Sequence, residues 1–429
     1  MVGPQTEAAV AYENSTRRDS PPDLDPASAA SSACAAILLA LGSPVVQSSG
    51  PEYNATTQDI WNLFNTLDQP TCIVYPRTGA DVQAAMANIF QFGSHYVVQA
   101  GAHSAMVGYN SITDGVLISF ANMTSTTYNP QTGTVTVQPG VRWGDAMAAI
   151  EHLGFDVGTG LLLGGGISYL APLYGWAGPT VLGIVTRYEL FPVRTGTKEQ
   201  KNWFGGSITY PASSSVAILE ASARYIRENT DTKAGFIALL NTIPSDVTAT
   251  VYLFYNGPSL PHSIFGDFLS IPNTSASLSP LSYFDISNLI PGNARGNGQQ
   301  FGAASWVGDE ATFLSGYNHF FNFTETFAAD LVGSDLIISP IPQSQWNATK
   351  TGANAIGDPG VAPPGVQAGF ELLLEQASSS PGLPLYINEC DASQNVFKTY
   401  PSFAALQKTY AKYDPSRFNV EHTTGPIGL

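Results

Sequence analysis

The segment His95-Tyr96-Val97-Val98-Gln99-Ala100-Gly101-Ala102-His103-Ser104 decides how this chain folds. Its first half contains a short apolar run that predicts a buried strand, and its second half is a glycine-containing loop. A second glycine-rich segment follows later, Gly158-Thr159-Gly160-Leu161-Leu162-Leu163-Gly164-Gly165-Gly166-Ile167-Ser168-Tyr169. Glycine lets backbone N–H groups approach a pyrophosphate because no Cβ stands in the way. The two segments therefore predict a pyrophosphate-binding site, with His103 placed to reach the edge of a bound ring system.

Strand and helix patterns alternate on both sides of this segment. Strands are predicted over residues 72–76, 96–99, 115–120, 133–140 and 184–191, and helices begin at Asp81 and Trp143. Gly93 and Gly154 stand where the two helices should end, since glycine is a common C-cap. Interleaved strands, helices and glycine turns predict an α+β domain over about residues 32–195. Residues 1–31 are polar, lack a period and are predicted to be disordered.

The pattern changes at Trp203. Strands are predicted over residues 204–210, 249–255, 336–340 and 383–388, with helix-forming runs in 213–228, 303–331 and 402–413. This order is typical of an antiparallel sheet backed by helices. The fold class is therefore α+β, with a substrate-binding lobe over residues 196–385.

Composition and charge exclude several classes of function. The 429 residues carry a formal net charge of −16, which would repel nucleic acid and anionic membranes. No run of about eighteen apolar residues occurs, so no membrane span is expected. The cysteines Cys34, Cys72 and Cys390 lack the spacing of a metal site, and they can be three buried thiols. No Gly-x-Ser-x-Gly, His-Glu-x-x-His or Walker motif supports a hydrolase or a nucleotidase.

The glycosylation signals indicate a secretory lineage. Asn-x-Ser/Thr sequons occur at Asn14, Asn54, Asn122, Asn273, Asn322 and Asn347. One sequon arises easily by chance, but six in a chain of low charge suggest a secreted glycoprotein. No apolar signal-peptide core is found in the first residues, where Arg17 and Arg18 stand instead. We therefore expect a secretory origin from the lineage. Because no signal peptide is found in this chain, a lost signal, a misassigned start and an intracellular protein are the open alternatives.

Further segments form an ordered set with the two glycine-rich ones. In chain order they are Cys72-Ile73-Val74-Tyr75-Pro76, Pro139-Gly140-Val141-Arg142-Trp143-Gly144-Asp145, Pro172-Leu173-Tyr174-Gly175-Trp176, Gly183-Ile184-Val185-Thr186-Arg187, Leu385-Tyr386-Ile387-Asn388 and Lys412-Tyr413-Asp414-Pro415-Ser416-Arg417-Phe418. Each motif alone is common. Together, over about residues 32–429, they resemble the berberine-bridge-type FAD-linked oxidoreductases of the vanillyl-alcohol-oxidase superfamily. The resemblance implies a PCMH-type FAD-binding domain of two α+β subdomains, to which a C-terminal segment, residues 386–429, returns.

The resemblance also implies roles for individual residues. His103 is expected to bond covalently to the 8α-methyl group of FAD, and Gly101, Ala102 and Ser104 to offer N–H groups to its pyrophosphate. Further cofactor contacts are expected from Gly160, Gly164, Gly165, Gly166, Ile184 and Val185. On the residues alone, a loop histidine bonded to the backbone is the favoured interpretation of His103, and a tight turn is an equal alternative for the glycines. Cys34 and Cys72 match positions that form a disulfide in such proteins.

Tyr386 and Asn388 fall on a segment that, in this family, faces the flavin from the substrate side. A tyrosine there could act as a general base if a neighbour lowers its pKa. The alternative is a tyrosine packed in a core. The implied reaction is oxidation of a C–H bond next to O or N in a small molecule. The electrons pass to O2, and the enzyme is expected to be a monomer.

Three departures from the family pattern leave other functions open. Ala102 replaces a glycine of the loop, and its Cβ could block a phosphate if the position needs a positive φ. Val157 passes directly to Gly158, where relatives carry a short loop, and the stretch from Trp176 to Gly183 lacks strands that relatives have there. A flavin-free scaffold acting as a cyclase, an isomerase or a binding protein is one alternative. An inactive truncated product is the other.

Overall fold

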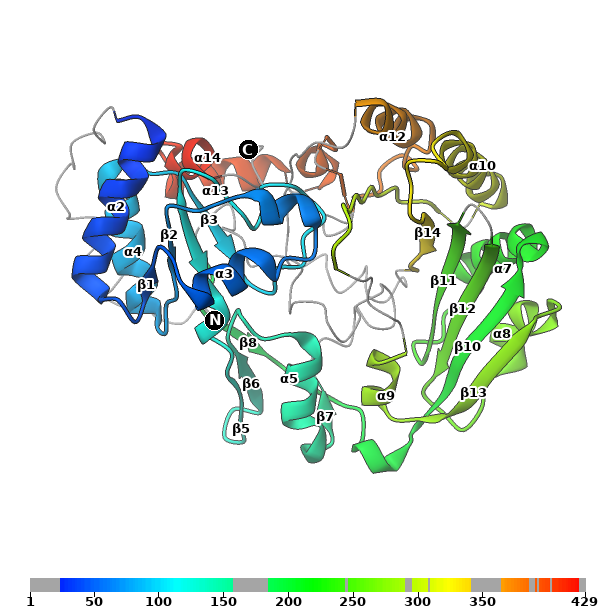
Figure 1. Ribbon diagram of the computed structural model, residues 1–429. Coiled ribbons are helices and arrows are strands. Elements are labelled where there is room, and N and C mark those ends of the chain that lie inside the picture. The colour runs from blue at the N-terminus through cyan, green and yellow to red at the C-terminus, as the bar shows by residue number, and fades with distance from the viewer. Residues whose placement is uncertain are drawn as a thin grey trace.

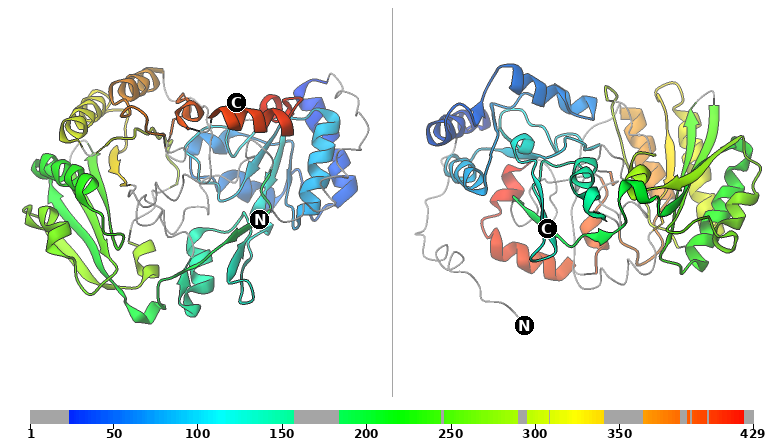
Figure 2. Two further views of the ribbon diagram at one scale, coloured as in Figure 1. Left: turned by 180° about the vertical axis from the view of Figure 1, so that it is seen from behind. Right: turned by 90° about the horizontal axis from the view of Figure 1, so that it is seen from below.

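The computed structural model describes residues 24–156, 184–243, 246–289, 295–307, 309–340, 364–385, 390–391, 393–401 and 403–423. These residues form two lobes, which lie at opposite ends of the molecule in Figure 1. The first lobe begins with α2 (Pro26–Leu41), and the second is built on a five-stranded sheet. Near the C-terminus, α13 (Phe403–Tyr413) and α14 (Phe418–His422) lie beside the first lobe in the front and back views (Figures 1 and 2). The mixed α+β class predicted from the sequence is confirmed.

The first sheet of the first lobe is buried on both faces. Its strands, in the order β1-β2-β4-β3, are β1 (Val46–Gln47), β2 (Cys72–Val74), β4 (Val116–Ser119) and β3 (Tyr96–Gln99). On one face α2 and α4 (Gly79–Phe92) pack against the sheet. On the other, Tyr53 of α3 (Pro51–Gln58) packs against Ile73, Val97 and Leu117. β4 runs parallel to β2 and β3, and such doubly covered parallel strands have continuous apolar sequences.

The local sequence fixes both ends of α4. At its start the Thr78 side chain accepts a hydrogen bond from the Asp81 N–H, and the Asp81 side chain accepts one from the Thr78 N–H. At its end Gly93 adopts the left-handed conformation with φ 64°. The buried positions Val82 and Ile89 recur at helical spacing and face the sheet. The helix predicted from Asp81 to Gly93 is therefore confirmed.

A disulfide joins α2 to the first sheet. Cys34 on α2 is bonded to Cys72 at the start of β2, with a Cα–Cα distance of 6.0 Å. The pairing implied by the family resemblance is thus confirmed. Cys390 is a buried free thiol. Helix α2 begins at Pro26, earlier than the order expected from Ser32, because the Asp25 side chain caps it by accepting a hydrogen bond from the Ser28 N–H.

The rest of the first lobe contains a second, smaller sheet. It consists of β5 (Thr126–Asn129), β6 (Thr134–Val137) and β8 (Tyr188–Leu190), and β7 (Phe155–Asp156) pairs separately with β9 (Val193–Arg194). The strand predicted over residues 184–191 is wrong at its start. Residues 184–187 form no strand, because β8 pairs with β6 only at Tyr188–Leu190. Helix α5 (Trp143–Ile150) follows β6.

The second lobe is the antiparallel sheet predicted from the sequence, with helices behind it. Its strands, in the order β13-β10-β12-β11-β14, are β13 (Ser275–Leu281), β10 (Trp203–Pro211), β12 (Asp246–Tyr255), β11 (Ala234–Ile243) and β14 (Asp335–Ile338). The helices are α7 (Ser215–Glu228), α8 (His262–Ser270), α9 (Tyr283–Ser287), α10 (Glu310–Thr326) and α12 (Pro364–Gln376). Side chains of α7, α8 and α10 share one core with the strands. Figure 1 shows α7 and α8 behind this sheet, and α10 beside α12.

The opposite face of this sheet packs on the first lobe. Ile237 and Tyr252 of the five-stranded sheet share a hydrophobic core with Trp143, Met147 and Ile150 of α5. All five side chains are buried. Because this contact is continuous and apolar, it holds α5 between the two lobes.

The C-terminal helices close the edge of the first sheet. The Tyr96 hydroxyl on the edge strand β3 donates a hydrogen bond to the side-chain oxygen of Asn419 at 2.8 Å, and Tyr96 also bridges to Thr423. The buried carboxylate of Asp414 accepts hydrogen bonds from the N–H groups of Phe418 and Asn419. Residues 383–385 of the predicted strand 383–388 are irregular, and the remainder lies outside the described residues.

The surface offers few further signals. The sequon residues Asn54, Asn122, Asn273 and Asn322 are all exposed, and glycosylation there stays a prediction. Within the described ranges, no helix is both long enough and apolar enough to span a bilayer. The same residues contain no cluster of three His, Cys, Asp or Glu side chains suited to a metal ion.

Candidate functional site

The candidate site is the loop that follows β3. Gly101, Ala102 and Ser104 are buried in it, and His103 is half-buried. Ala102 has φ 55°, in the left-handed region that favours glycine. The departure from the family pattern at this position therefore places a Cβ where the backbone needs a positive φ. The loop keeps the conformation at the cost of local strain.

Replacing Ala102 with glycine is expected to stabilise the protein. The left-handed conformation costs an alanine about 1–2 kcal/mol, and the greater flexibility of glycine in the unfolded chain offsets about 0.5–1 kcal/mol of this. We expect Ala102→Gly to raise the free energy of unfolding in urea by about 0.5–1 kcal/mol. Ala105→Gly is the matched control, since Ala105 has a negative φ in the same loop and should gain nothing. A lower free energy of unfolding in Ala102→Gly than in the wild type would contradict backbone strain at Ala102.

His103 lies against an aromatic ring from a distant part of the chain. Its imidazole stacks on the indole of Trp61 with a centroid distance of 4.1 Å and an interplanar angle of 8°. The loop and Trp61 are also joined through the backbone, because the Trp61 N–H donates to the Ala102 carbonyl at 3.0 Å. Burial, with a smaller contribution from the nearby Arg142 guanidinium, lowers the pKa of His103 to about 4. His103 is therefore neutral at physiological pH.

Asn62 ties the loop to the second lobe. This fully buried residue donates from its side-chain amide to the carbonyls of Ala105, at 2.5 Å, and Gln299, at 3.1 Å. Its side-chain oxygen accepts from the Gln299 N–H at 3.2 Å. One amide side chain thus fixes two segments that lie far apart in the sequence.

Asn65 fixes the later part of the same loop. Its amide donates to the Met106 carbonyl at 3.1 Å, and its oxygen accepts from the Gly108 N–H at 2.7 Å and from the Ser111 hydroxyl at 3.1 Å. Asn65 is fully buried. It lies three residues after Asn62 in a 3-10 turn, where side chains at this spacing lie on the same side.

Polar groups in this loop fit an anionic dinucleotide. Among the described residues, no hydrogen bond is formed by the backbone N–H groups of Gly101, Ala102 and His103. The Asn110 side chain is buried, and neither its oxygen nor its nitrogen has a hydrogen-bond partner in the part of the chain that the structure describes. Burying a polar group without a hydrogen-bond partner costs folding free energy, and a bound phosphate or ribose would supply the missing partners. Gly101, His103 and Asn110 would hold such a group, whereas Ala102, with its positive φ, meets the condition under which its Cβ was expected to hinder a phosphate.

The other predicted cofactor residues are only partly described. Ile184 is half-buried and packs against the core of the first sheet, and Val185 is half-buried beside it in the chain. Gly160, Gly164, Gly165 and Gly166 lie outside the described residues, as do the predicted catalytic residues Tyr386 and Asn388. Their roles stay predictions.

The residues that flank the predicted catalytic segment lie against the His103 loop. Leu385 and Cys390 are buried and share a small core with Met106 and Tyr109 of the loop. Two segments that the sequence assigned to one site are therefore neighbours in the fold.

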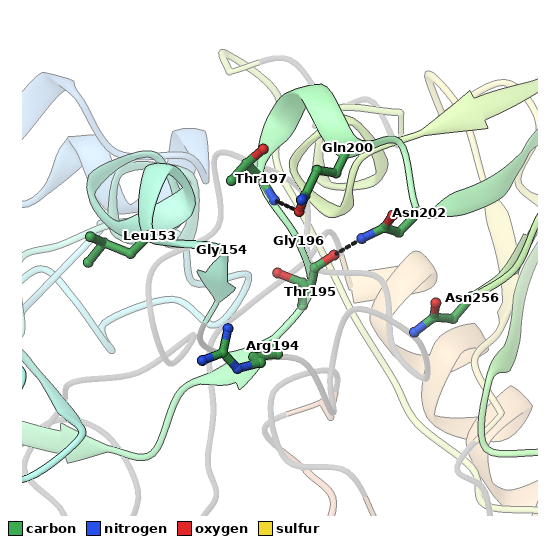
Figure 3. A pocket seen from close by; sticks show the side chains of 9 residues that line it. All are labelled: Leu153, Gly154, Arg194, Thr195, Gly196, Thr197, Gln200, Asn202 and Asn256. Carbon is green, nitrogen blue, oxygen red and sulfur yellow. Dashed lines mark hydrogen bonds between the residues drawn. The ribbon is translucent and has the colours of Figure 1, made fainter.

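A separate cavity lies beside the connection between the two lobes. It has a volume of about 550 Å³ and is lined by Leu153, Gly154, Arg194, Thr195, Gly196, Thr197, Gln200, Asn202 and Asn256 (Figure 3). None of these belongs to the predicted site. The Thr197 N–H donates to the Gln200 side chain, and the Asn202 amide donates to the Thr195 carbonyl. These two hydrogen bonds stabilise the turn before β10.

Sequence reasoning missed the residues that hold His103 in place. Trp61, Asn62 and Asn65 precede the first predicted strand and match none of the quoted motifs. The one signal for them is the spacing of two asparagines by three residues, which places both on one side of a turn. Arg142 was quoted only as part of a motif, although it lies near enough to His103 to affect its pKa.

Parallel strands that end in a glycine-containing loop, whose backbone N–H groups have no hydrogen-bond partner among the described residues, are compatible with binding of a dinucleotide. Residues 70–185 match a family model described as an FAD binding domain. An FAD-linked oxidoreductase of Arthroderma benhamiae is 30% identical over 372 residues, covering 75% of this chain and 73% of that protein. The bifunctional solanapyrone synthase of Alternaria solani is 24% identical and covers 84% and 82%, respectively.

Solved structures share the fold at low identity. 6-Hydroxy-D-nicotine oxidase from Arthrobacter nicotinovorans superposes with a TM-score of 0.65 at 16% identity, covering 87% of this chain and 95% of that one. Berberine bridge enzyme from Eschscholzia californica has a TM-score of 0.60 at 14% identity, with 92% and 99% covered. The chain belongs to the FAD-linked oxidoreductases, and it shares the fold of berberine bridge enzyme.

Proposed function

We propose that this FAD-dependent oxidoreductase oxidises a C–H bond next to O or N in a small organic molecule and passes the electrons to O2. FAD would supply the hydride acceptor when bound. The observation that carries the proposal is the loop after β3, which brings backbone N–H groups and a neutral histidine to one place. The names of the fungal relatives, which include a solanapyrone synthase, support a natural product as substrate.

His103 would hold the cofactor covalently. A bond between one of its ring nitrogens and the 8α carbon of FAD replaces one hydrogen of the methyl group and the N–H hydrogen of the imidazole. The bond would form at the expense of these two hydrogens, and O2, the electron acceptor named above, would take up both protons and both electrons as H2O2. A neutral imidazole can form this bond because one ring nitrogen keeps its lone pair. The pKa of His103, about 4, keeps that form populated at neutral pH.

Tyr386 and Asn388 remain the proposed catalytic pair on the substrate side. The proposal rests on the family resemblance and on the position of Leu385 and Cys390 beside the His103 loop. Tyr386 would accept the proton of the substrate hydroxyl or amine as hydride leaves the adjacent carbon.

The test begins with the purified protein after expression with ample riboflavin. We expect yellow protein with flavin absorption bands and one FAD per chain. With a compound that the enzyme oxidises, one H2O2 should form for each O2 consumed. Incorporation of an oxygen atom from O2 into the product would instead indicate a monooxygenase. Colourless protein that stays flavin-free after incubation with FAD would contradict the proposal and favour a flavin-free scaffold.

A further inference from the structure

The Trp61–His103 stack joins the predicted flavin attachment point to a residue outside every motif of the family resemblance. The rings are nearly parallel, at 8°, and their centroids are 4.1 Å apart. Trp61 is 3% exposed, so its indole is a fixed part of the interior. A buried, parallel contact of this kind restricts both the tilt of the imidazole and its rotation about the side-chain bonds.

Several contacts hold Trp61 in place. The backbone N–H of Trp61 donates to the carbonyl of Ala102, the residue before His103. Phe301 packs against the indole at a centroid distance of 5.4 Å and an angle of 56°. The next residue, Asn62, is bonded to both the His103 loop and residue Gln299. The indole is therefore positioned by the same contacts that position the loop.

The stack leaves the reactive part of the imidazole uncovered. Trp61 lies over a face of the ring, whereas the bonding directions of the two ring nitrogens lie in the ring plane. A face contact can thus orient the ring without blocking an in-plane bond to a cofactor.

We propose that Trp61 is a positioning residue that holds the His103 imidazole in the orientation for covalent flavin attachment. This role rests on the attachment proposed above. The indole also keeps water from one face of the imidazole. Burial is the main cause of the low His103 pKa, and Arg142 is the charged group that adds to it. Trp61 therefore favours the neutral, nucleophilic form as well as the orientation.

The first readout needs no flavin. In flavin-free protein, the His103 ring protons should resonate upfield because they lie over the indole, and NMR titration should give a pKa near 4. Trp61→Leu removes the aromatic face, so this pKa should move toward the ordinary value of 6.5. Trp61→Phe retains a smaller aromatic ring, so its His103 pKa should lie between those of the wild type and Trp61→Leu. An unshifted His103 signal in the wild-type protein overturns the proposal even if no variant folds.

The second readout is the rate of covalent attachment when flavin-free protein is incubated with FAD. Trp61→Leu should attach flavin at least about tenfold more slowly, while reversible FAD binding through the loop changes little. Trp61→Phe should recover much of the rate. Phe301→Leu loosens the packing of Trp61 but keeps the face against His103, so it should slow attachment less than Trp61→Leu does.

The outcomes separate this role from the proposed function. A wild-type protein that binds FAD but never attaches it overturns the covalent link and the role of Trp61 with it. A wild-type protein that attaches FAD, with Trp61→Leu attaching it at the same rate, overturns only the role of Trp61.

Discussion

Replacing His103 with alanine is expected to abolish acid-stable flavin attachment completely. The residue lies in the loop after β3, its imidazole is neutral at physiological pH, and its ring nitrogens are not covered by the stacked Trp61. Cys34 and Cys72 are joined in a disulfide, so neither can form a cysteinyl link to the flavin. His103→Ala should still bind FAD reversibly, because the N–H groups of the loop belong to the backbone and are kept in the variant. Loss of the covalent bond should also lower the flavin potential and slow substrate oxidation.

Denaturing electrophoresis with flavin fluorescence provides the measurement. The wild-type band should fluoresce after acid treatment, and the His103→Ala band should be dark. His152→Ala is a suitable control, because His152 is exposed after α5 and belongs to no part of the site. A fluorescent His103→Ala band would place the attachment elsewhere and show that this loop was aligned wrongly with the family.

The parts of the fold that sequence patterns predicted well are those with strong local signals. Helix α4 has a capping box, buried residues at helical spacing and a terminal glycine, and each signal acts within a few residues. Strand β13, by contrast, went unpredicted. It is Ser-Ala-Ser-Leu-Ser-Pro-Leu, mostly exposed, and it forms an edge of its sheet by backbone pairing with β10. No apolar alternation reveals such a strand.

The site was predictable where it depends on local chain conformation and not where it depends on distant contacts. The glycine loop and His103 can be recognised within ten residues of sequence. Asn62 acts on the carbonyl of Ala105, 43 positions away, and on that of Gln299, 237 positions away. Such contacts arise only when distant segments of the chain come together in the folded protein, so the spacing of Asn62 and Asn65 does not reveal which groups they bind. The stack of Trp61 on His103 has the same origin.

Removing the Cys34–Cys72 disulfide is expected to cost about 2–4 kcal/mol of folding free energy, since the bond closes a loop of 38 residues in the unfolded chain. It ties α2 to β2, and both cysteines are buried in the core of the first lobe. The double variant Cys34→Ala/Cys72→Ala avoids leaving an unpaired thiol or a buried hydroxyl. Unfolding in urea should therefore shift to clearly lower denaturant concentration, with the largest change in the first lobe.

Counting thiols tests the bond itself in the wild-type protein. Unreduced, denatured material should react at Cys390 alone, and reduction should release the two further thiols of the bridge. Cys390→Ala is the matched variant for stability, because it removes a buried cysteine without opening a covalent loop and should cost less than the double variant. Three reactive thiols in protein purified from an oxidising compartment would contradict the bridge. Equal stability of the double variant and the wild type would show that packing of α2 against α4 and the first sheet holds the helix without the covalent bond.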